Sequence, residues 1–135
     1  MNPEERRLVL VADDDAAIRQ LIARQLQPLD CDVLEARDGE EAVRLALAHE
    51  PDLLIVDSEM PGLSGYDVTR EVRSRLPAHV PVLLISAGGA PDEVSEALEV
   101  GADGYLRKPF GGAELREAVR ELLTPAENGS AQNKT

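Results

Sequence analysis

The stretch LVLVADDD at residues 8–15 decides the fold, because an unbroken apolar run ends there at three consecutive aspartates. Five apolar residues without alternating polar ones predict a strand that is buried on both faces, as strands of parallel sheets are. Residues 53–57, LLIVD, repeat the pattern, with a second apolar run that ends at Asp57. The carboxyl ends of parallel strands share one edge of a sheet, so we expect the two strands to bring their aspartates together.

The rest of the chain alternates between signals for strands and signals for helices. Further strands are predicted at residues 31–36, 80–85 and 104–108, and the first of these is polar enough for an edge strand. Apolar residues at helical spacing predict five helices: one that Asp15 caps and Pro28 closes, one from Asp38 to about Ala48, and others near residues 66–75, 91–101 and 113–123. Right-handed crossovers between such elements predict an α/β fold with a doubly wound parallel sheet.

Composition and charge narrow the classes of function. The 135 residues suit one domain, expected at 7–123, between an N-terminal extension at 1–6 and a disordered tail or linker stub at 124–135. With 26 acidic and 14 basic residues the formal net charge is −12, which disfavours direct binding to nucleic acid or membranes. The single cysteine, Cys31, the charged N-terminus and the lack of an apolar run of about 20 residues favour a cytoplasmic protein.

Polar side chains cluster where the predicted strands end. Asp13, Asp14 and Asp57 follow two of the strands, and Ser86 and Lys108 follow the last two. Carboxylates held close together raise one another's pKa unless a cation intervenes, and hard oxygen ligands favour Mg²⁺, with Mn²⁺ as an alternative. A lysine and a hydroxyl beside such a cation suit a phosphoryl group, which leaves Asp57 as the nucleophile that forms an aspartyl phosphate.

Four stretches together resemble the receiver domain of two-component response regulators. They are LVLVADDDAAIR at residues 8–19, DLLIVDSEMPGLSGYDV at 52–68, PVLLISA at 81–87 and GADGYLRKPF at 101–110. The resemblance covers about residues 7–123. It implies the flavodoxin-like, CheY-like version of the doubly wound fold, with five strands in the order 2-1-3-4-5 and five helices.

The resemblance also implies a role for each polar residue at the strand ends. Asp57 would accept the phosphoryl group, and Ser86 and Lys108 would contact it. Tyr105 would change rotamer with the state of Ser86, and the Lys108–Pro109 peptide bond would be cis. The metal ligands would be Asp13, Asp14, Asp57 and the backbone carbonyl of Glu59.

A receiver of this kind is a signalling domain that catalyses only its own phosphorylation and dephosphorylation. The phosphodonor would be a bacterial histidine kinase or a histidine phosphotransfer protein. Output would be a change on the face of the fourth helix, fifth strand and last helix, which carries Leu106 and Arg107 and would bind a downstream protein or a second copy of the chain. In the family, the positions of Glu59 and Gly88 modulate the lifetime of the phosphoryl group.

Two other functions fit part of the pattern. A phosphatase of the haloacid dehalogenase type also uses Mg²⁺, an aspartate after a strand and a carboxylate two residues later, as Glu59 would be. That family places its nucleophile before the other metal carboxylates and encloses the substrate with a cap domain, whereas here Asp13 and Asp14 come first. A pseudo-receiver that binds partners without phosphorylation is disfavoured, because all the polar positions at the strand ends are filled.

Overall fold

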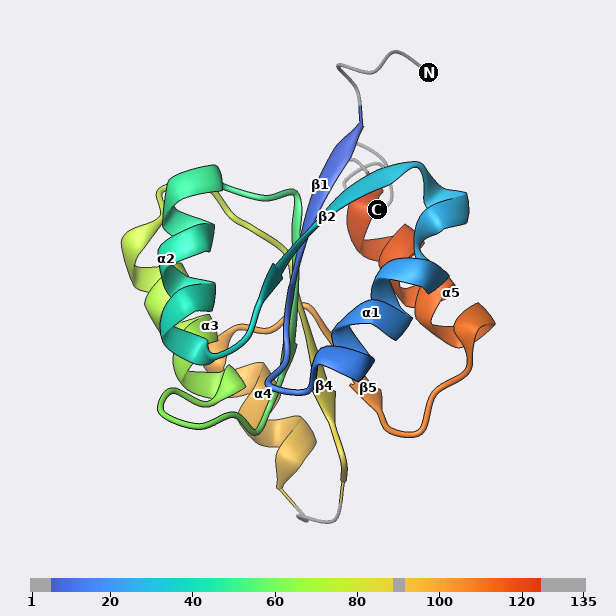
Figure 1. The fold of residues 1–135 in the computed structure, drawn as a ribbon. Helices are drawn as coiled ribbons and strands as arrows, with labels where there is room; N and C mark the ends of the chain where they lie inside the picture. Colours follow the sequence, from blue (N-terminus) through green and yellow to red (C-terminus); the bar gives the residue numbers. More distant parts are fainter. Residues whose placement is uncertain (1–5, 89–91, 125–135) are drawn as a thin grey trace, which may run out of the picture.

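In the computed structural model, which describes residues 6–88 and 92–124, five strands form one parallel sheet (Figure 1). They are β1 (Arg7–Ala12), β2 (Cys31–Ala36), β3 (Leu53–Asp57), β4 (Val82–Ser86) and β5 (Gly104–Arg107). The spatial order is β2-β1-β3-β4-β5, which confirms the predicted order 2-1-3-4-5. The order reverses between β1 and β3, and ligands of open parallel sheets bind outside the carboxyl ends of the strands at such a point.

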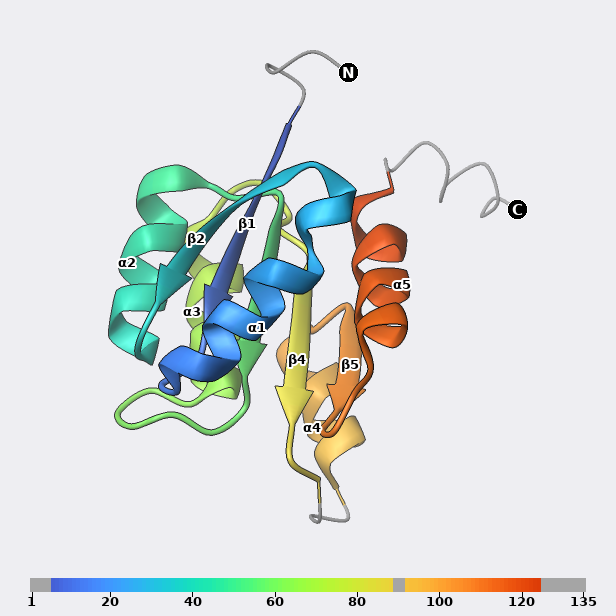
Figure 2. The same ribbon diagram turned by 45° about the vertical axis from the view of Figure 1, so that its right-hand side comes forward.

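Helices cover both faces of the sheet. They are α1 (Ala16–Gln25), α2 (Gly39–His49), α3 (Gly65–Arg75), α4 (Glu93–Val100) and α5 (Gly112–Leu123). Helices α1 and α5 pack on one face, whereas α2, α3 and α4 pack on the other (Figure 2). Among the described residues, no helix combines the length and the apolar character that crossing a membrane requires.

The central strands send side chains to both faces of the sheet. Along β1, Val9 and Val11 pack toward α1 and α5, whereas Leu10 and Ala12 pack toward α2, α3 and α4. All four side chains are at most 1% exposed. This burial on both sides explains why the sequence of β1 is an unbroken apolar run rather than an alternating one.

Side-chain caps fix where the helices begin at the carboxyl edge of the sheet. Asp15 and Asp38 cap α1 and α2, as predicted, by accepting hydrogen bonds of 2.9 and 2.8 Å from backbone N–H groups two and three residues further on. Ser64 and Asp67 form a reciprocal capping box at the start of α3, which the sequence analysis did not identify. Helix α1 ends before Pro28, which lies in a separate 3-10 turn at Gln27–Leu29.

Helix α4 presents apolar side chains to solvent. Only Ala97 and Val100 face the core, whereas Val94 and Leu98 are 54% and 70% exposed. The helix therefore contacts the core through Ala97 and Val100, whereas Val94 and Leu98 lie on the adjacent, solvent-facing side of the helix. The part of the predicted helix before Asp92 lies outside the described residues.

Candidate functional site

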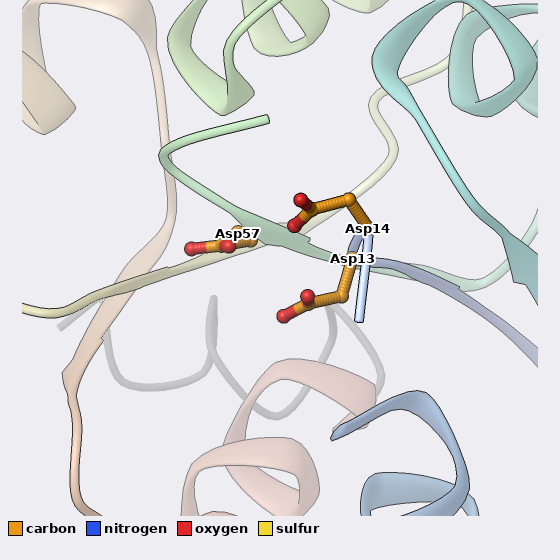
Figure 3. Close-up of side chains that lie close together, drawn as sticks. All are labelled: Asp13, Asp14 and Asp57. Carbon is orange, nitrogen blue, oxygen red and sulfur yellow. The ribbon is translucent and has the colours of Figure 1, made fainter. Parts of the chain in front are cut away.

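The carboxyl ends of β1 and β3 bring three aspartates together, as Figure 3 shows. One carboxylate oxygen from each of Asp13, Asp14 and Asp57 lies within 4.8 Å of the others. Asp13 and Asp57 are buried, whereas Asp14 is exposed. The cluster forms where the strand order reverses, which is where the sequence analysis expected these residues to meet.

Hydrogen bonds hold Asp13 at its backbone and at its carboxylate. Its N–H donates to the carbonyl of Ala36, at the end of β2, over 3.1 Å. Its Oδ1 accepts a 2.9 Å hydrogen bond from the N–H of Asp15. Its backbone carbonyl accepts a 2.7 Å hydrogen bond from Nη1 of Arg19, in the first half of α1. The position of Asp13 is therefore set by β2, by the cap of α1 and by a side chain of α1.

Two glycines shape the loop that follows Asp57. Gly62 has a φ of 79°, the left-handed conformation that the third residue of a type II turn requires. Gly65 packs directly on the end of β3, because a Cβ atom at this position would lie 2.3 Å from the carbonyl oxygen of Asp57. Within the loop, the N–H of Glu59 donates a long hydrogen bond of 3.5 Å to Oδ1 of Asp57. The loop thus turns back tightly beneath the acidic cluster.

Lys108 brings a positive charge to the cluster from the end of β5. Its Nζ lies 3.6 Å from Oδ2 of Asp13 and 3.6 Å from Oδ2 of Asp57. Its backbone N–H donates to the carbonyl of Ser86, at the end of β4, over 2.7 Å. The Lys108–Pro109 peptide bond is cis, as the resemblance implies. The lysine therefore bridges the two buried carboxylates.

Burial makes the two inner carboxylates costly to ionise. The pKa of Asp57 rises from 3.8 to about 6, first because burial removes water from the carboxylate and then because Asp13 adds a neighbouring negative charge. Lys108 opposes this rise in the pKa of Asp57, because its ammonium favours the ionised form. The pKa of Asp13 is also raised, again chiefly by burial. A further positive charge beside these two carboxylates would therefore favour their ionised forms.

Ser86 and Tyr105 lie beside one another at the α4 side of the site. The Ser86 side chain is fully buried, and its Oγ accepts a 3.0 Å hydrogen bond from the N–H of Gly88. The Tyr105 hydroxyl donates a hydrogen bond to Oε1 of Glu93, in the first turn of α4. Burial and this hydrogen bond raise the pKa of the Tyr105 phenol, whereas the Ser86 hydroxyl lowers it. Tyr105 thus links the carboxyl end of β4 to α4.

The structure also reveals contacts that the sequence did not predict. Arg19 contacts Asp13, and Glu93 contacts Tyr105, and neither contact was predicted. Arg107 lies over Gly88, because a Cβ atom at Gly88 would be 2.2 Å from the Nε of that arginine. Charged residues are common on exposed surfaces, so the presence of an arginine or a glutamate at these positions does not predict which residue it contacts.

Fold and site together define a class: a doubly wound α/β protein with an acidic cluster and a lysine at the point where the strand order reverses. The family model for the response regulator receiver domain matches residues 9–120, so the chain belongs to this family. It is the receiver domain of a two-component response regulator. This match does not favour a dehalogenase-type phosphatase or a pseudo-receiver.

Known proteins resemble the chain over most of its length. The phosphate regulon transcriptional regulatory protein PhoB of Pseudomonas aeruginosa is 33% identical over 127 residues, which cover 93% of this chain and 56% of PhoB. The chain spans about half the length of the curated relatives it matches.

Solved structures of receivers have the same fold. The chemotaxis response regulator CheY4 of Vibrio cholerae matches with a TM-score of 0.80 and 31% identity, over 87% of this chain and 98% of that one. The receiver domain of the sensor histidine kinase PA1611 of P. aeruginosa, with a magnesium ion coordinated in its active site cleft, has a TM-score of 0.80 and 29% identity. That match covers 89% of this chain and 99% of the PA1611 receiver.

Proposed function

We propose that Asp57 accepts a phosphoryl group from a phosphohistidine and that the phosphorylated domain signals through its α4, β5 and α5 face. One observation supports this assignment above the others: the carboxylate of Asp57 is buried within 4.8 Å of two further carboxylates and 3.6 Å from the ammonium of Lys108. Phosphoryl transfer depends chiefly on positioning and on neutralisation of charge. The site offers a fixed nucleophile and a fixed cation for this purpose.

The transfer itself needs no separate general base. A carboxylate oxygen of Asp57 attacks phosphorus, the P–N bond of the phosphohistidine breaks, and the electron pair of that bond stays on the imidazole nitrogen, which takes up a proton. Lys108 would balance charge on the phosphoryl oxygens as it now balances Asp13 and Asp57. The Ser86 hydroxyl, whose oxygen accepts a hydrogen bond from the Gly88 N–H, would donate its own hydrogen to one of them.

The acidic cluster fits a magnesium ion. Asp13, Asp14 and Asp57 offer carboxylate oxygens close enough to share one cation, and the backbone carbonyl of Glu59 follows in the adjoining loop. These are hard oxygen donors, which suit Mg²⁺ and also Mn²⁺. When bound, the cation would neutralise charge on the carboxylates and on the phosphoryl group. The raised pKa values of Asp13 and Asp57, which burial causes first of all, are consistent with this assignment, because a cation would favour the ionised form of both carboxylates.

Ser86 and Tyr105 supply the route from the site to the surface. Movement of the Ser86 hydroxyl toward a phosphoryl group would change the environment of the Tyr105 phenol, whose pKa that hydroxyl now lowers. Tyr105 holds Glu93, so a new rotamer of Tyr105 would release or shift the first turn of α4. The signal would thus reach α4 through two side chains and one hydrogen bond.

The proposed output face is more apolar on α4 than its sequence predicts. Leu106 does not belong to it, because this residue is only 6% exposed and packs with the α1 and α5 side of the core. Exposed apolar surface comes instead from Val94 and Leu98 of α4, beside a hollow of about 90 Å³ that Tyr105 also lines. Acidic residues surround this surface, so a partner with basic residues around an apolar patch, or a second copy of the chain, would fit.

The proposed cellular role of the chain is that of a phosphorylated signalling receiver. Residues 7–123 form a bacterial, cytoplasmic receiver that catalyses only its own phosphorylation and dephosphorylation and takes its phosphoryl group from a histidine kinase or a histidine phosphotransfer protein. The net charge of −12 argues against direct nucleic-acid binding by this chain. PhoB, about half of which the chain matches, is named as a transcriptional regulatory protein, so the proposal is limited to the receiver itself.

Intact mass spectrometry tests the phosphoacceptor directly. The wild type, incubated with Mg²⁺ and a small phosphodonor such as acetyl phosphate, should gain one phosphoryl group, and Asp57→Asn should gain none. Asp30→Asn, which changes an exposed aspartate at the end of the 3-10 turn, is the matched control and should be phosphorylated normally. An unmodified wild type would support a pseudo-receiver, and a phosphorylated Asp57→Asn variant would assign the role to another residue.

Amide hydrogen exchange tests the output. Phosphodonor and Mg²⁺ should change protection between residues 92 and 123 as well as near Asp57, and Tyr105→Phe should weaken the change in α4 while leaving phosphorylation intact. Changes confined to the neighbourhood of Asp57 would rule out the proposed switch.

A further inference from the structure

Arg19 joins the acidic cluster to the edge strand of the sheet. Its Nη1 donates a 2.7 Å hydrogen bond to the backbone carbonyl of Asp13, and its Nε lies 2.9 Å from Oε1 of Glu35, in β2. The Arg19 side chain is only 16% exposed, which is low for an arginine on a surface helix. Both contacts use the planar guanidinium, whose fixed geometry allows it to hold two acceptors at once.

The carbonyl that Arg19 binds belongs to the peptide that leads into Asp14. The N–H of Asp13 is already fixed by the carbonyl of Ala36, the residue after Glu35. Arg19 fixes the other side of the same residue, so the chain is held on both sides of Asp13 just before it reaches Asp14. Asp14 is exposed, and burial does not hold its carboxylate in place as it does the carboxylate of Asp13.

We propose that Arg19 is a positioning residue for the cation site: by holding the Asp13 carbonyl, with Glu35 as its anchor, it orients the peptide that directs the Asp14 carboxylate toward the cluster. This inference rests on the proposed magnesium role of the cluster. Arg19 itself contacts neither a carboxylate of the cluster nor a reacting atom. Its role is to keep the exposed ligand in place before a cation arrives.

The charge of Arg19 and its positioning contacts predict opposite effects of its removal on the affinity for Mg²⁺. An arginine near a cation site repels the cation, so removal of its charge alone would tighten Mg²⁺ binding. Removal of a residue that orients a ligand weakens binding, and loss of such supporting contacts typically costs about tenfold or more in metal affinity. The direction of the change therefore separates the two roles.

Calorimetric titration with Mg²⁺ measures this direction without relying on phosphorylation. We expect the dissociation constant to rise about tenfold in Arg19→Met. Arg19→Lys keeps the charge but replaces a two-point contact with one, so we expect a smaller rise. Arg24→Met removes a positive charge from an exposed position in the last turn of the same helix and should leave the constant unchanged. Glu35→Gln should matter less in the Arg19→Met background than in the wild type, because the two residues act together.

A second measurement needs no metal. In the metal-free protein, NMR relaxation should show greater motion of the Asp14 amide in Arg19→Met than in Arg24→Met. Equal or tighter Mg²⁺ binding by Arg19→Met would overturn the inference, and so would an unchanged Asp14 backbone in that variant. If the wild type failed to bind Mg²⁺ at all, the proposed function would fail, and the relaxation data would still decide whether Arg19 positions Asp14.

Discussion

Asp57→Asn should stabilise the metal-free protein at neutral and alkaline pH. The pKa of Asp57 is about 6 in the folded protein and 3.8 in the unfolded chain. Since the folded pKa is the higher one, the folded state is favoured while the carboxyl is protonated, and that advantage is lost as the pH rises from 3.8 through about 6. The difference between the two pKa values corresponds to about 3 kcal/mol of unfolding free energy at pH 8.

The variant should recover most of that free energy, because asparagine carries no charge. Part is offset, since Lys108 loses one of its two carboxylate partners. We therefore expect Asp57→Asn to be more stable than the wild type by about 2 kcal/mol at pH 8, or roughly 7 °C in Tm, with the gain shrinking below pH 6 and vanishing near pH 4.

Urea unfolding between pH 4 and pH 8, with a chelator present, measures this difference. Asp30→Asn controls for loss of an exposed negative charge, and asparagine tolerates the left-handed conformation of residue 30, whose φ is 54°. An Asp57→Asn variant no more stable than the wild type at pH 8 would refute the reasoning. A gain of constant size from pH 4 to pH 8 would do so too, because it would trace the stabilisation to something other than ionisation.

Three further substitutions have defined outcomes. Lys108→Met should raise the pKa of Asp57 above about 6, measured by carbon-13 NMR of the carboxyl groups, because the ammonium 3.6 Å away now opposes the effect of burial. Asp15→Ala should lower the unfolding free energy by about 1 kcal/mol in urea because α1 loses its cap, whereas Asp15→Asn should change it little. Tyr105→Phe should cost about 1 kcal/mol by the same assay, because the half-buried hydrogen bond to Glu93 is lost.

The parallel sheet and the edge at which the aspartates lie could be predicted from the sequence for one physical reason, whereas the order of the strands came from the resemblance to receiver domains. A strand that is buried on both faces appears in the sequence as an unbroken run of apolar residues. The residue at which this run ends marks the edge of the sheet where the strands have their carboxyl ends. Asp13 and Asp57 stand where such runs end, so the parallel arrangement puts them on one edge, and the adjacency of β1 and β3 brings them together. The caps by Asp15 and Asp38 were predictable because they depend on residues two or three positions away.

Contacts between distant side chains could not be predicted in this way. Arg19 reaches Glu35 across the space between α1 and β2, and nothing in the local sequence specifies that geometry. The exposed side of α4 was missed for a related reason. A stripe of apolar residues shows that a helix is amphipathic, but which ridge meets the sheet depends on how the helix is rotated, and here Ala97 meets it while Val94 and Leu98 do not.

In the proposed function, one cluster of charges affects stability, metal binding and signalling. Asp13, Asp14 and Asp57 bring three negative charges to one end of the sheet, and Lys108 supplies one positive charge among them. Phosphorylation replaces the charge of Asp57 with a group that carries about −1.5 to −2. A divalent cation offsets much of that added negative charge. The charge that remains would be stabilised by hydrogen-bond donors that can move toward the phosphoryl group. The Ser86 hydroxyl, now bound to the Gly88 N–H, is such a donor, and its displacement is what Tyr105 would carry to α4.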